Sequence, residues 1–96
     1  MFIISLTYKV PMERVEVELN NHVEYLKEQY ALGNFQASGR KVPRTGGVIL
    51  SQLKDKKQLE KILAQDPFHK NELADYSITE FIPSMTSKEL SCLLEL

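Results

Sequence analysis

Cysteine is nearly absent from this 96-residue chain, and its scarcity excludes several kinds of site. Cys92 is the only cysteine, so an internal disulfide framework is excluded. The Cys/His spacings typical of zinc sites are missing as well. We therefore expect no metal and no cofactor, and the chain fits the reducing cytoplasm.

Long hydrophobic runs and an excess of charge of one sign are also lacking. No apolar run approaches the ~18 residues that a membrane helix needs, and the start MFIISL has neither the basic residues nor the cleavage site of a signal peptide. Lys and Arg total 12 against 13 Asp and Glu, so no broad positive surface is available for nucleic-acid phosphates. These absences predict a cytoplasmic protein that binds neither membranes nor nucleic acid.

The hydrophobic pattern predicts one domain that begins with a strand and a long helix. Residues 2–8 (FIISLTY) are rich in β-branched and aromatic residues, which is typical of a strand. A helix is predicted from Pro11 to about Gly33, a residue suited to a helix C-terminus. Its apolar stripe recurs at spacings of three and four, at Val15, Leu19, His22, Val23, Leu26 and Tyr30.

The rest of the chain predicts a hairpin, a helix and a last strand. Residues 35–40 and 46–53 are short strand-like runs joined by a loop. Asp55 is a candidate cap for a second helix, and residues 76–82 (YSITEFI) predict the final strand. The order is therefore βαββαβ.

A C-terminal extension follows this domain. We assign residues 1–83 to the domain and residues 84–96 to the extension. Thr86 followed by Glu89 matches a capping box, which predicts a short helix there with Leu90, Leu93 and Leu94 on one side.

The element order predicts an α+β fold, a ferredoxin-like sandwich with two helices on one face of a four-stranded antiparallel sheet. The stretches FII and VIL place apolar side chains on both faces of their strands. A half-solvated sheet would alternate apolar with polar residues instead. A second copy of the chain is the simplest cover for the other face, so we expect a homodimer formed through the sheet faces.

Four short stretches together resemble the YciI-like family of small dimeric α+β barrel proteins. They are NNHVEYL in the first helix, ASGR in a strand, QDPF, and FIP at the end of the last strand. The resemblance implies a ferredoxin-like protomer, sheet-to-sheet dimers, and a site built on a histidine and an aspartate, here His22 and Asp66. Gly39-Arg40 stands where family members often have Gly-Pro. One branch of the family eliminates chloride from chlorinated hydroxyquinones.

Asp66 has two interpretations on its own chemistry. Asp followed by Pro is typical of a helix start, because Asp accepts free N–H groups of the first turn and Pro fits the first helical position. The carboxylate can instead orient an imidazole and raise its basicity. One oxygen would then cap while the other orients.

His22 also has two interpretations. It lies on the apolar stripe and should face the sheet, as a hydrogen-bonded core histidine or as a general acid/base in the site. His69 should project elsewhere from a helix and is expected to be exposed. A metal site formed by these two histidines and Asp66 has no supporting spacing.

The loop GRKVPRTGG predicts a local positive field. No acidic residue lies between Glu28 and Asp55, whereas Arg40, Lys41 and Arg44 cluster within this span. The loop would attract an anionic or electron-rich small-molecule substrate, or it is an ordinary solvated hairpin. Ser38 would offer a hydroxyl beside the pocket, or serve packing alone.

Three functional classes remain. The first is a cofactor-independent lyase, isomerase or hydrolase that acts on a small cyclic or carbonyl-containing substrate, with His22 as acid/base and Asp66 as its orienting partner. The second is a non-catalytic ligand-binding or regulatory dimer. The third is a cofactor-free monooxygenase, suggested only by the architecture.

Overall fold

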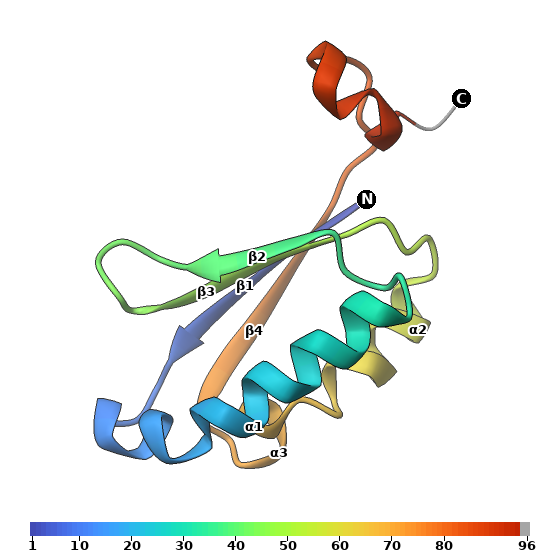
Figure 1. Ribbon diagram of the computed structural model, residues 1–96. Helices are drawn as coiled ribbons and strands as arrows, with labels where there is room; N and C mark the ends of the chain where they lie inside the picture. The colour runs from blue at the N-terminus through green and yellow to red at the C-terminus, as the bar shows by residue number, and fades with distance from the viewer. Residues whose placement is uncertain (95–96) are drawn as a thin grey trace.

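A computed structural model describes residues 1–94 and shows one four-stranded antiparallel sheet with helices packed on one face (Figure 1). The strand order β2-β3-β1-β4 is that of a ferredoxin-like fold, as expected from the element order. The elements in chain order are β1 (Phe2–Tyr8), α1 (Met12–Ala31), β2 (Ala37–Arg40), β3 (Gly46–Ser51), α2 (Lys56–Leu63), α3 (Pro67–Lys70), β4 (Ala74–Glu80) and the 3₁₀ helix η1 (Lys88–Leu93).

Strand register decides which side chains face the helices. In the centre of the sheet, Leu6 of β1 lies opposite Gly47 of β3 and Tyr76 of β4. Arg40 of β2 lies opposite Gly47 in turn, and Ser38 lies opposite Ile49. Opposed residues in a sheet share a face, so β2 and β4 project side chains to the helix side at these positions.

The core lies between this face and the three α-helices. Helix α1 crosses the sheet, whereas α2 and α3 lie beside it on the same face (Figure 1). Helix α2 contributes Leu59, Ile62 and Leu63, which are buried. The side chains in the core that are fully shielded from solvent include Phe2, Ile4, Val15, Leu59 and Phe68.

The residues at the start of α2 and at the end of α1 agree with the predictions. Asp55 caps α2 by accepting a hydrogen bond from the backbone N–H of Lys57 at 2.9 Å. Helix α1 ends at Ala31, and Gly33 follows with φ of +78°, a conformation that glycine adopts without steric cost.

The opposite face of the sheet carries no described helix, and it is apolar in part, with polar Ser77 and Thr79 of β4 beside apolar residues of β1 and β3. Ile3 pairs with Leu50, and Ser5 pairs with Val48. All four are only partly shielded from solvent within one chain. Apolar side chains on both faces of β1 and β3, expected from FII and VIL, are therefore present.

Two details near the C-terminus differ from the predictions. Strand β4 begins at Ala74, two residues before the predicted start, because its N-terminal residues still pair with β1. The C-terminal helix is a 3₁₀ helix whose first flanking residue is Ser87, and no side chain caps it. The predicted capping box of Thr86 and Glu89 is therefore wrong. Beyond β4, η1 lies apart from the three α-helices (Figure 1).

Candidate active site

Helix α1 directs His22 toward the sheet, as its place on the apolar stripe predicted. The side chain is 12% exposed. Its ring stacks on that of Phe68, with ring centroids 3.9 Å apart and planes at 3°. Tyr8 of β1 contacts the same phenylalanine edge-on, at 5.9 Å between centroids. The imidazole is thus held in one plane by aromatic packing.

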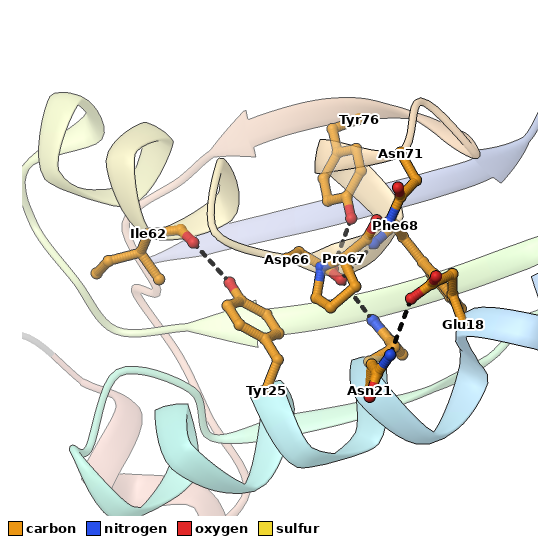
Figure 2. A network of polar contacts seen from close by, with 10 residues as sticks. Glu18, Asn21, Tyr25, Ile62, Asp66, Pro67, Phe68, Asn71 and Tyr76 are labelled. Carbon is orange, nitrogen blue, oxygen red and sulfur yellow. Dashed lines mark hydrogen bonds and ion pairs between the residues drawn. The ribbon is translucent and has the colours of Figure 1, made fainter.

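Asp66 joins three parts of the chain through its carboxylate. It is fully buried and caps α3, where its Oδ1 atom accepts the backbone N–H of Phe68 at 2.9 Å. The same oxygen pairs with Nδ1 of His22 at 2.8 Å. Oδ2 accepts the phenol of Tyr76 at 2.5 Å. Figure 2 shows Tyr76 and Phe68 converging on Asp66 from β4 and α3.

The two carboxylate oxygens of Asp66 accept different sets of hydrogen bonds from those predicted. One oxygen was expected to cap while the other oriented the histidine. Instead, Oδ1 performs both tasks and Oδ2 is reserved for Tyr76. The reason is that Tyr76 comes from β4, a different element from α3, and no local sequence pattern predicts that its phenol reaches Asp66.

The contact with Asp66 defines the tautomer of a neutral His22. An ionised carboxylate only accepts hydrogen bonds, so Nδ1 of the imidazole must carry the proton. The lone pair then lies on Nε2, and no described residue hydrogen-bonds that atom. His22 also lines a cavity, named the main cavity here because it holds this histidine and not because of its size, so the geometry suits exchange of a proton between Nε2 and a bound molecule.

This cavity has a volume of about 380 Å³ and lies between α1 and the β2–β3 half of the sheet. Ser38, Arg40 and Arg44 line it together with His22, whereas Asp66 lies behind the histidine. The remaining wall is mostly apolar or glycine, formed by Leu6, Tyr8, Leu19, Leu26, Gly39, Gly46, Gly47, Val48, Ile49 and Phe68.

The polar side chains of the cavity differ in how they are held. The hydroxyl of Ser38 pairs with that of Tyr30 at 2.5 Å, which links β2 to the end of α1. Arg40 and Arg44 are exposed, and neither forms an ion pair within residues 1–94. Their guanidinium groups remain available to an anion in the cavity.

Two tyrosines flank the carboxylate, of which Tyr25 is buried and Tyr76 is partly buried. Burial, followed by the negative charge of Asp66, raises the pKa of Tyr25 above its ordinary value. Burial is also the main reason that the pKa of Tyr76 is raised, and the charge and hydrogen bond of Asp66 add to it. Both phenols therefore stay neutral donors, with Tyr25 donating to the carbonyl of Ile62 at 2.8 Å (Figure 2).

His69 stands outside this arrangement. It is exposed, as expected, and makes an edge contact with Tyr76 at 5.2 Å between centroids. Within residues 1–94 there is no group of three or more His, Cys, Asp or Glu side chains that could hold a metal ion. No helix in the same span is long and apolar enough to cross a membrane.

Phe68 and Tyr76 are the two site residues that the sequence reasoning missed. Tyr76 alternates with Ile78 on β4, a pattern that would have placed both on one face of the strand. Phe68 follows Asp66 by two residues, at the first turn of α3. Neither signal points to a histidine 46 or more positions away.

The fold and the site together define a small ferredoxin-like α+β protein with a histidine–aspartate pair at its main cavity. The chain belongs to the YCII-related domain family, whose model matches residues 1–82. This finding confirms the resemblance drawn from the short sequence stretches.

The same fold is found among solved structures of other proteins. One of them is 5-chloro-2-hydroxyhydroquinone dehydrochlorinase from Burkholderia phenoliruptrix, in complex with 2,5-dihydroxybenzoquinone. It matches with a TM-score of 0.71 and 18% sequence identity, over 83% of this chain and 91% of that chain. No curated protein sequence matched the chain.

Proposed function

We propose that this protein is a cofactor-independent enzyme of the lyase, isomerase or hydrolase type. His22 acts as the general acid/base and Asp66 orients it, on a small cyclic or carbonyl-containing substrate. The observation that carries the proposal is the 2.8 Å hydrogen bond between Nδ1 of His22 and a fully buried carboxylate, which leaves Nε2 free at a cavity of about 380 Å³.

The chemistry begins with proton transfer to Nε2. His22 takes the proton of a phenol, an enol or a carbon next to a carbonyl, and the electron pair left on the substrate forms a new carbonyl or C=C bond. In an elimination, a leaving anion departs with its own bonding pair. The imidazolium formed is stabilised by Asp66, and it returns its proton to the product or to the leaving group.

The cavity favours an anionic or electron-rich substrate. Arg40 and Arg44 add positive charge at its rim, and Ser38 offers a hydroxyl. Arginine is suited to stabilising an enolate or phenolate oxygen as its charge develops. The dehydrochlorinase with the same fold acts on a hydroxylated ring and was crystallised with a dihydroxybenzoquinone, which supports a small oxygenated ring as substrate class here.

The working form in this proposal is a cytoplasmic homodimer joined through the sheet faces. Ile3 and Leu50 are partly exposed apolar residues on the face of the sheet opposite the described helices. Burying them against a second copy would remove them from water and leave the cavity on the other face open.

A screen of turnover tests the proposal. Purified protein is incubated with small hydroxylated quinones, phenols and lactones, and product formation is compared with that of His22→Asn, Asp66→Asn and the double variant. We expect turnover by the native protein and a large loss in each single variant. The double variant should be little worse than either, because members of one catalytic unit are not additive.

A matched control is available in the same region. His69→Asn removes an exposed histidine that lies outside the main cavity, so turnover should be retained. Binding of these compounds without turnover would contradict the proposal in favour of a ligand-binding protein. Oxygen consumption during turnover would contradict it in favour of a monooxygenase.

A further inference from the structure

The second oxygen of the Asp66 carboxylate has a partner of its own. Tyr76 reaches it from β4 and donates its phenol to Oδ2 at 2.5 Å. Oδ1 is already occupied by two donors, Nδ1 of His22 and the backbone N–H of Phe68. A carboxylate that lacks any contact with solvent is therefore satisfied entirely by protein groups.

We propose that Tyr76 is a positioning residue, the third member of a chain His22–Asp66–Tyr76 that sets the orientation and proton affinity of the imidazole. Tyr76 is absent from the lining of the main cavity, so it acts only through Asp66. The inference rests on the proposed function for its catalytic meaning. The coupling between the Tyr76 phenol and the His22 imidazole does not depend on that function.

The coupling follows from how a buried carboxylate shares its charge. The phenol draws negative charge toward Oδ2, and less remains on Oδ1 to stabilise a charged imidazole. It also blocks rotation of the carboxylate, because Oδ2 would have to leave its donor. Asp66 is thereby held with one defined oxygen toward His22.

Tyr76 also separates the carboxylate from a second cavity. This cavity, of about 530 Å³, is lined by Tyr76, His69 and residues of α2 and β4. Asp66 does not line it and is fully buried. The phenol ring therefore acts as a wall, so Tyr76→Phe preserves the shielding and removes only the hydrogen bond.

The other ionisable groups around His22 must be held constant in any test. Those that lie on the elements packed about it are Tyr8 of β1, Tyr25 of α1, Arg40 of β2, Arg44 of the β2–β3 loop, Asp66 before α3, and His69 of α3. None is altered by Tyr76→Phe, so a change in the titration of His22 reports on the phenol.

Tyr25 supplies a matched control. It is a buried tyrosine near Asp66, its ring lies 6.4 Å from that of His22, and its hydroxyl donates to Ile62 instead of the carboxylate (Figure 2). Tyr25→Phe thus removes a buried phenolic hydroxyl near the same histidine without touching Asp66.

The experiment is an NMR titration of the imidazole in the native chain and the two variants. In Tyr76→Phe, the titration midpoint of His22 should move upward by at least ~0.5 pH unit, because Oδ1 becomes a stronger acceptor for the imidazolium. In Tyr25→Phe the midpoint should stay within ~0.2 pH unit of the native value. Equal midpoints in the native chain and in Tyr76→Phe would overturn the inference.

A measurement on the unaltered protein covers the case in which Tyr76→Phe fails to fold. With carbon-13 in the tyrosine Cζ positions, the Tyr76 signal should shift with the same midpoint as His22, since the two groups share a carboxylate. A Tyr76 signal that ignores the titration of His22 would refute the coupling. Neither readout uses turnover, so failure of the proposed reaction and failure of this inference are distinguishable.

Discussion

His22 and Asp66 lie 44 positions apart in sequence, yet their side chains meet at 2.8 Å through Nδ1 and Oδ1. The two come from different elements, the middle of α1 and the residue that caps α3. The cap and the contact with histidine use the same oxygen. Any substitution of Asp66 therefore affects local helix stability and the histidine together, unless it retains that oxygen.

Asp66→Asn retains an oxygen for the cap and for Nδ1 but removes the negative charge. We expect a loss of turnover on the order of 10² to 10⁴, with a decrease in the free energy of unfolding of only about 1 kcal/mol. Asp66→Ala leaves three donors without a partner and should cost about 3 kcal/mol or more. Urea denaturation of both variants checks the difference, and equal destabilisation by Asn and Ala would contradict this account.

The role of the positive charge at the cavity can be tested by removing the two arginine side chains that line it. Changing Arg40 and Arg44 to Gln should weaken binding of an anionic ligand and flatten the dependence of its affinity on salt. Lys41→Gln is the control, because its Nζ donates to Thr7 at 3.1 Å and the residue does not line the cavity. Calorimetric titration at two salt concentrations measures both. The same affinity in all variants at low salt would remove the rim from the site.

Two glycines at the cavity should tolerate alanine very differently. A Cβ on Gly46 would lie 1.7 Å from the carbonyl oxygen of Leu6, which is backbone of the central strand and cannot yield. Gly46→Ala should therefore destabilise the fold by about 3 kcal/mol or prevent folding. A Cβ on Gly39 meets nothing within 4 Å, so Gly39→Ala should change stability by no more than ~0.5 kcal/mol. Thermal melting compares the two, and similar melting temperatures would show this packing to be wrong.

Stability should fall in alkaline solution because of the phenols of Tyr25 and Tyr76. The pKa values of Tyr25 and Tyr76 are raised in the folded chain by burial and by Asp66, whereas an unfolded chain loses its tyrosine protons from about pH 10. The stabilisation is thus complete below pH ~10 and is lost as pH rises above it, by roughly 1.4 kcal/mol per pH unit for each tyrosine. Urea denaturation across this range measures the slope. Tyr25→Phe and Tyr76→Phe should each reduce the slope of stability against pH by the contribution of one titrating proton. An unchanged slope in either variant would contradict the expectation for that residue.

The sheet-to-sheet dimer predicts a doubled mass. Sedimentation at micromolar concentration should give about twice the 11.0 kDa of the chain, with at least ~1,200 Å² buried in total. Leu50→Glu places a charge on the apolar face and should shift the assembly toward monomer. Val17→Glu is the control, because Val17 lies on α1, away from the proposed interface, and is already 77% exposed. A folded monomer of the native chain at that concentration would rule the dimer out.

Much of the fold can be predicted from short-range patterns in the sequence. The first strand, the helix capped by Asp55 and the helix ended before Gly33 were all predictable, because periodicity and caps act between residues a few positions apart. The family resemblance supplied His22 and Asp66 as a pair. The C-terminal capping box failed for the opposite reason, since a four-residue pattern has little to stabilise it without packing.

The tertiary structure alone decided how the pair is held. Tyr76 and Phe68 reach Asp66 and His22 because β4 and α3 pack behind α1, and no spacing in the sequence encodes that proximity. The same packing assigns Oδ1 to two donors and Oδ2 to a third. Short-range patterns determine which elements form, whereas the environment of a buried charge depends on which elements meet, and their meeting is a property of the whole folded chain.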